Sequence, residues 1–135
     1  MELKELIEKL NATNTNKKLF GLVVYEIAGN GCLNGMWSNN FSNGIFMQEI
    51  ARKIKNKNDD EISGEYFVSY IEPEIEPIIG KLTIEKNNDE TYNLKWHHLR
   101  ASWEKEETDP SIVFEGIGMK TGEKQLTVFY WGIEN

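Results

Sequence analysis

The chain has 135 residues, of which 39% are apolar and 27% charged, and its formal net charge is −7 at pH 7. This length suits one domain with its own hydrophobic core, and the composition excludes the disordered and membrane classes. The acidic balance argues against nucleic-acid binding, because phosphate backbones attract proteins rich in Lys and Arg. Cys32 is the single cysteine, so no disulfide can form within the chain.

The first predicted element is a short amphipathic helix over residues 1–10. Leu3, Leu6, Ile7 and Leu10 recur at the spacing of one helix face, with Glu and Lys between them. So short a helix is marginal alone, and its apolar stripe is expected to pack on a larger body.

The same N-terminal stretch bears on localisation. It is acidic and amphipathic, unlike the basic start and apolar run of a signal peptide, and no apolar stretch in the sequence reaches membrane-spanning length. These features favour a cytoplasmic protein that does not enter a membrane.

Residues 11–18 are predicted to be a polar linker, and after it the apolar period changes to two, which is typical of strands. The predicted strands cover residues 19–27, 33–37, 45–54, 62–71, 78–86, 92–103, 112–120 and 125–133. The segment 45–54 also fits a helix, although we favour a strand. Residues 72–77 contain two prolines and are expected to form a loop, because proline cannot donate within a sheet.

Most predicted connections have hairpin length, which favours a meander of neighbouring antiparallel strands. A meander of this size removes its exposed edges by closing on itself. The sequence therefore predicts a single mainly β domain over residues 1–135, with an up-and-down barrel of about eight strands over 19–133 behind the N-terminal helix. A two-sheet sandwich is the alternative.

Several segments resemble a group of bacterial calycin-like β-barrel proteins, sometimes labelled fibronectin-binding. They are Gly21 to Glu26, the alternating Gly31, Leu33, Gly35 and Trp37, Gly64 to Val68, Tyr92 to Trp96, and Gly116 to Met119 with Leu126 to Val128. In that group the segment like Gly21 to Glu26 comes near the end of the domain, so the resemblance implies a circularly permuted barrel. The pattern is also similar to avidin-like barrels, but their biotin-contacting residues find no match. The resemblance implies a fold and neither a reaction nor a ligand.

The richest candidate site lies on the strand that begins at Tyr92. Regular alternation would put Trp96, His98 and Arg100 on one face, which becomes more polar along its length. A barrel interior ending in His and Arg near its mouth would suit a small anionic or amphipathic ligand. The alternative is that His98 and Arg100 have left the sheet and face solvent. With Tyr66 and Trp131 added, the predicted ligand-binding set is Tyr66, Trp96, His98, Arg100 and Trp131.

Other chemistry finds less support in the sequence. His97 and His98 are adjacent and should point to opposite faces, so they are not expected to share a metal ion unless a bulge intervenes. No nucleophile and base pair, metal set or cofactor motif is recognisable, and no enzyme activity or cofactor is predicted. Glu26, Glu49 and Glu115 fall within strands and are expected to face outward.

The sequence thus leaves two function classes open. The first is binding of a small, partly apolar ligand inside the barrel. The second is a protein-binding module, such as an inhibitor, an immunity-type protein or a homo-oligomer, which the acidic surface and long polar loops would suit.

Overall fold

The computed structural model describes residues 18–57, 60–71, 77–104 and 110–133, and these contain eight strands and no helix. The strands are β1 (Phe20–Ile27), β2 (Cys32–Asn39), β3 (Met47–Asn56), β4 (Gly64–Tyr70), β5 (Ile78–Lys86), β6 (Thr91–Ala101), β7 (Ile112–Gly122) and β8 (Gln125–Gly132). The predicted N-terminal helix, most of the linker and most of the proline-containing loop lie outside the described residues. No helix in the described part of the chain has the length and apolarity needed to cross a membrane.

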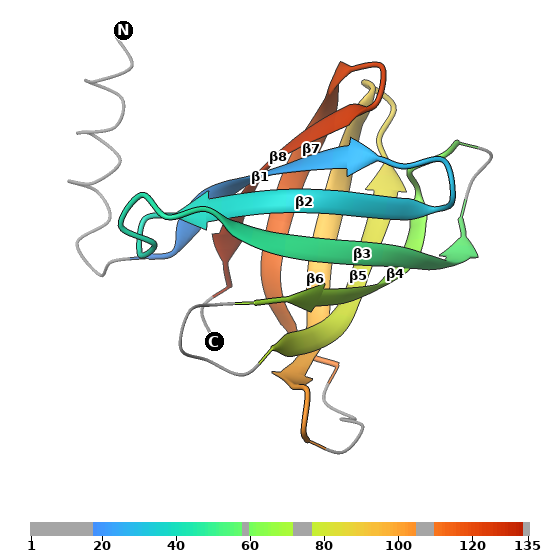
Figure 1. The fold of residues 1–135 in the computed structure, drawn as a ribbon. Helices are drawn as coiled ribbons and strands as arrows, with labels where there is room; N and C mark the ends of the chain where they lie inside the picture. The colour runs from blue at the N-terminus through green and yellow to red at the C-terminus, as the bar shows by residue number, and fades with distance from the viewer. Residues whose placement is uncertain (1–17, 58–59, 72–76, 105–109, 134–135) are drawn as a thin grey trace, which may run out of the picture.

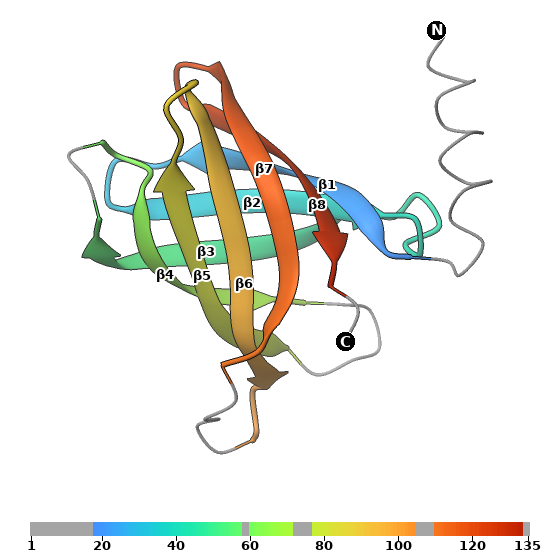
Figure 2. The ribbon, with the colours of Figure 1, turned by 180° about the vertical axis from the view of Figure 1, so that it is seen from behind.

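The eight strands form one closed antiparallel barrel in simple chain order. Each strand pairs with the next, and β1 also pairs with β8, with Val23 opposite Val128. Figure 1 shows β1, β2 and β3 side by side on one side of the barrel, and Figure 2 shows β5, β6 and β7 on the other. The predicted barrel is confirmed and the two-sheet sandwich is excluded, because the ring of paired strands has no break.

The segment that also fitted a helix is strand β3. It pairs with β2 and β4 along most of its length, with Ala51 opposite both Leu33 and Val68. The strand interpretation of this segment is therefore confirmed.

Side-chain alternation builds the core. On β1, for example, Val23 and Tyr25 are buried inside the barrel while Leu22 and Val24 are exposed outside it. The buried apolar residues come from every strand except β7, together with one loop residue: Val23, Tyr25, Ile27, Leu33, Trp37, Ala51, Ile62, Tyr66, Val68, Leu82, Ile84, Tyr92, Leu94, Trp96, Leu126, Val128 and Tyr130. On β7 the fully buried inward positions are Gly116 and Gly118, and a Cβ at Gly116 would come within 2.9 Å of Val128. The neighbouring β8 side chains fill the space that these glycines leave.

The two ends of the barrel differ. One end is called the terminal end here, because β1 enters the barrel and β8 leaves it there. At this end β1, β3, β5 and β7 begin and β2, β4, β6 and β8 finish. At the opposite end lie the turns that join β1 to β2, β3 to β4, β5 to β6 and β7 to β8. The interior side chains near the terminal end include most of the large aromatic residues, and the candidate site lies there.

Candidate functional site

A buried carboxyl group lies inside the barrel on β3. Glu49 is only 6% exposed, and its carboxylate accepts a hydrogen bond from the Tyr25 hydroxyl on β1. The indole N–H of Trp96, on β6, also hydrogen-bonds to this carboxyl group. Three strands from different parts of the chain thus meet at one acidic side chain, in an interior otherwise lined mainly by apolar groups.

Gly35 makes this contact possible. It lies on β2 between Tyr25 on β1 and Glu49 on β3, level with both. A Cβ at Gly35 would come within 2.7 Å of the Tyr25 ring. Because glycine leaves this space empty, the Tyr25 ring can lie across β2 and reach the Glu49 carboxylate.

Burial sets the protonation of Glu49. It raises the pKa of this carboxyl group from 4.5 to about 7, because the charged form loses its hydration, while the hydrogen bonds from Tyr25 and Trp96 act in the opposite direction. Burial, followed by the nearby Glu49 charge, raises the pKa of the Tyr25 phenol well above its usual range. Near neutral pH, Glu49 is therefore partly protonated and partly ionised, while Tyr25 keeps its proton and remains a hydrogen-bond donor.

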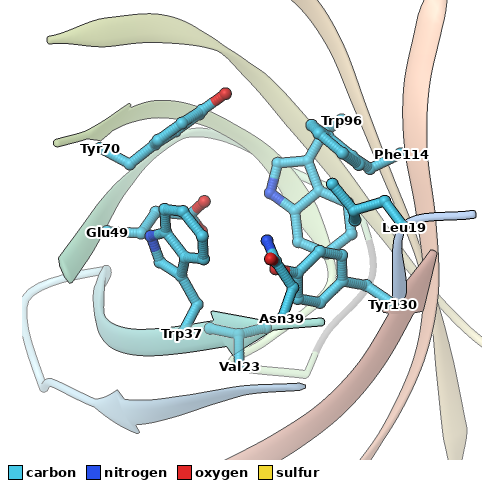
Figure 3. A pocket seen from close by; sticks show the side chains of 9 residues that line it. All are labelled: Leu19, Val23, Trp37, Asn39, Glu49, Tyr70, Trp96, Phe114 and Tyr130. Carbon is cyan, nitrogen blue, oxygen red and sulfur yellow. The ribbon is translucent and has the colours of Figure 1, made fainter. Parts of the chain in front are cut away.

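Five aromatic side chains surround a pocket in front of Glu49 (Figure 3). Trp37 and Tyr70 pack edge to face on one side, with ring centroids 5.7 Å apart. Trp96, Phe114 and Tyr130 form the other side, with mutual centroid distances of 5.8 to 6.5 Å. The two groups face each other across the pocket.

The pocket lies at the terminal end of the barrel. Leu19 and Asn39 line its rim, and the Asn39 amide donates to the Tyr130 hydroxyl at 3.1 Å. Asn39 also accepts hydrogen bonds from Phe41 and Ser42 in the loop that follows β2. The loop after β2 thereby fixes the side chain that meets Tyr130 at the rim.

The pocket is small. Its volume is about 50 Å³, which is room for about three to five water molecules. An outer hollow of about 390 Å³ adjoins it and shares Leu19, Trp37 and Asn39 with it. The exposed apolar side chains of Phe41 and Ile45 line this outer hollow.

The Trp37 indole N–H is a second polar group of the site. Its ring is 93% buried and lines the pocket, yet the nitrogen has no hydrogen-bond partner. A buried donor without a partner carries a free-energy cost of about 1–3 kcal/mol. A water molecule at this nitrogen would remove that cost.

Trp96 is the one member of the predicted ligand-binding set that lines this pocket. Tyr66 is also interior, but it lies toward the opposite end, where its hydroxyl donates to the Ile62 carbonyl at 2.6 Å. Trp131 follows the inward-facing Tyr130, so it lies on the outer face, where its ring contacts that of Phe129.

A bulge on β6 removes His98 and Arg100 from the pocket. His98 and Leu99 together oppose the single residue Gly80, and His98 takes a φ of 57°, in the left-handed region. This extra residue shifts the alternation by one. Leu99 packs against the core in place of His98. The alternation expected from the sequence therefore stops at Trp96, and the three residues do not share one face.

The bulge also brings two imidazoles together. Because it turns His98 toward the outer face, its Nδ1 atom lies 2.6 Å from Nδ1 of His97, while Nε2 of His97 lies 3.0 Å from the Thr83 hydroxyl. Within the described ranges, no cluster of three or more His, Cys, Asp or Glu side chains could hold a metal ion. The contact between the two rings is a hydrogen bond between their Nδ1 atoms.

The expectation that Glu49 faces outward is wrong. Its neighbours on β3 show why the sequence misleads, because the apolar Ile50 is 55% exposed while the acidic Glu49 lies inside. The usual pattern of apolar-in and polar-out is inverted at this point. The available signal was the small size of two interior neighbours. Gly35 lies directly opposite Glu49 and Ala51 lies two positions along β3, so a larger interior side chain has room beside them.

The described part of the chain is thus a closed eight-stranded meander barrel, with an aromatic pocket and a buried carboxyl group at one end. Comparisons with protein-family models, with curated proteins and with solved structures each found no match for this chain.

Proposed function

We propose that the protein binds a small ligand through the pocket at the terminal end of its barrel. The buried Glu49 carboxyl group carries this proposal. Glu is almost never fully buried unless it is paired, and a strongly shifted pKa in a concave site is typical of functional groups. An aromatic pocket with a few converging polar groups is also the usual form of a small-molecule site.

The energetic argument is that Glu49 weakens the fold. A buried carboxyl group with a raised pKa destabilises the folded state increasingly as pH rises through neutrality. Tyr25, Gly35 and Trp96 are nevertheless arranged around it. An arrangement that costs stability and faces a pocket supports a role in recognition.

The volumes favour a ligand with two parts. The inner pocket admits a head of about three to five non-hydrogen atoms, and the outer hollow beside Phe41 and Ile45 has room for an apolar tail. A partly apolar ligand in the barrel interior was also expected from the sequence. The packed core fills the middle of that interior, so the proposed site is at its terminal end.

A pocket-blocking variant tests the proposal. Leu19→Trp would fill the rim of the pocket, whereas Phe67→Trp places the same side chain on the outer face of β4 as a control. Both are screened with wild type against small amphipathic amines, alcohols and acids by thermal shift and calorimetry. We expect at least one compound to bind wild type and the control but not Leu19→Trp. Absence of binding to wild type, or equal binding to all three proteins, would contradict the proposal.

A second candidate function is self-association through the outer face of β7, β8, β1 and β2. The register places a continuous apolar band there, because Ile117 is opposite Phe129, Phe129 opposite Leu22, and Val24 opposite Met36. All five are between 39% and 53% exposed. In a chain of net charge −7, this uncharged band is where two copies would approach with least repulsion, so we propose a second copy of the chain as its partner.

Sedimentation or light scattering at increasing protein concentration tests this second candidate. We expect a dimer that Leu22→Lys disrupts and that Thr83→Lys, on the outer face of β5, leaves intact. A monomer at high concentration, or a dimer insensitive to Leu22→Lys, would contradict it.

A further inference from the structure

The charge of the ligand follows from the groups around the inner pocket. We infer that the buried head of the ligand is a small cation, either a primary amine or a quaternary ammonium group. This inference rests on the ligand-binding function proposed above and adds the chemical class of the head group.

The first argument is that Glu49 lacks a basic partner. Among the described residues, the groups that contact its carboxyl are Tyr25 and Trp96, and no Lys, Arg or His acts on it. An unpaired buried carboxylate has a high free-energy cost. A positive charge from outside the described residues would stabilise the ionised form. A cation in the pocket would supply that charge.

The second argument is the aromatic wall. Trp37 and Tyr70 face Trp96, Phe114 and Tyr130 across the pocket (Figure 3). Aromatic faces attract cations through their electron-rich π systems, and cages of several rings are a recurring way to bind ammonium groups. The Glu49 carboxylate would repel an anionic head, so the pocket disfavours it.

Among the described residues, the remaining titratable groups at the pocket are the phenols of Tyr25 on β1, Tyr70 on β4 and Tyr130 on β8. The pKa of the Tyr25 phenol is raised well above its usual range, so this group is uncharged near neutral pH. The neighbouring positions on β2 are Gly35 and Trp37, which carry no charge. Glu49 is thus the group whose ionisation sets the pH dependence of cation binding.

A charge-matched panel tests the inference. Butylammonium, 1-butanol and butanoate share a similar apolar tail and differ in the charge of the head. Calorimetry at pH 8 with the full chain should show butylammonium binding at least tenfold more tightly than either of the others. Since the pKa of Glu49 is about 7, its ionised fraction, and with it the affinity for the cation, should fall about tenfold from pH 8 to pH 6.

A pair of variants assigns the effect to Glu49. Glu49→Gln keeps the size of the side chain and its ability to accept hydrogen bonds, and it should weaken butylammonium binding at least tenfold at pH 8. Glu26→Gln removes the same charge from the exposed face of β1 and should leave the affinity unchanged. A circular dichroism spectrum like that of wild type shows that each variant has folded.

The outcomes separate the inference from the proposed function. If butanol or butanoate binds in the pocket as well as butylammonium, the cationic head is wrong and the binding function stands. If Glu49→Gln binds butylammonium as tightly as wild type, the carboxylate does not select the ligand and the inference also fails. If no compound of the wider screen binds wild type, both the inference and the proposed function fail.

Discussion

Replacing Glu49 by Gln should make the protein more stable at neutral and alkaline pH. In the folded chain the pKa of Glu49 is about 7, whereas in the unfolded chain it returns to about 4.5. Between these values the unfolded state gives up its proton first, so the free energy of unfolding of wild type falls as pH rises. The difference of about 2.5 pKa units corresponds to about 3 kcal/mol.

The sign of the effect fixes its pH window. Below about pH 4.5 the group is protonated in both states and contributes nothing, while above about pH 7 the destabilisation is complete. The Gln variant has no group to titrate at this position. Its stability relative to wild type should therefore grow by about 2.5 kcal/mol between pH 5 and pH 8, since part of the change occurs below pH 5.

Urea unfolding followed by tryptophan fluorescence at pH 5, 6, 7 and 8 measures this difference directly. Glu26→Gln serves as the control for net charge, because it removes the same charge from an exposed position. Parallel pH profiles for wild type and Glu49→Gln would refute the reasoning, since Glu49 would then have the same affinity for protons in both states.

Three further predictions concern the surroundings of the site. Tyr25→Phe removes a hydrogen bond that lowers the pKa of Glu49, so a carboxyl NMR titration should show a pKa above that of wild type; an unchanged or lower value would contradict the contact. Gly35→Ala should lower the free energy of unfolding in urea by about 1–3 kcal/mol, because its Cβ would come within 2.7 Å of the Tyr25 ring. Gly29→Ala, whose Cβ would meet nothing within 4 Å, should lower it far less, and equal losses would argue against this packing. At the β6 bulge, where φ is 57°, His98→Val should cost about 1–2 kcal/mol and His98→Gly close to nothing, and the reverse order would show that the backbone is not constrained there.

The sequence predicted the barrel well because its strands follow a simple physical rule. Period-two alternation, as in Ile62 to Ile71, together with hairpin-length connections, implied about eight paired strands in chain order. Closure followed from the cost of leaving strand edges unpaired. Each of the eight predicted strands overlaps an observed one, including the ambiguous segment that became β3.

The candidate site could not be predicted in the same way, because it depends on two local exceptions to that rule. The bulge at His98 shifts the alternation of β6, and nothing in the local sequence distinguishes it from a regular strand. Glu49 faces inward although acidic strand residues usually face outward. Its burial depends on Tyr25 and Gly35, which lie far away in the sequence, so only the three-dimensional register brings them together.

The four tryptophans allow the most direct test of the ligand site. Trp37 and Trp96 line the pocket, whereas Trp131 lies on the outer face and Trp103 is 71% exposed. In a titration with butylammonium at pH 8, followed by the indole NMR signals, we predict saturable shifts at Trp37 and Trp96 and none at the other two. Equal shifts at all four indoles, or no shift at Trp37 and Trp96, would contradict a cation site in front of Glu49.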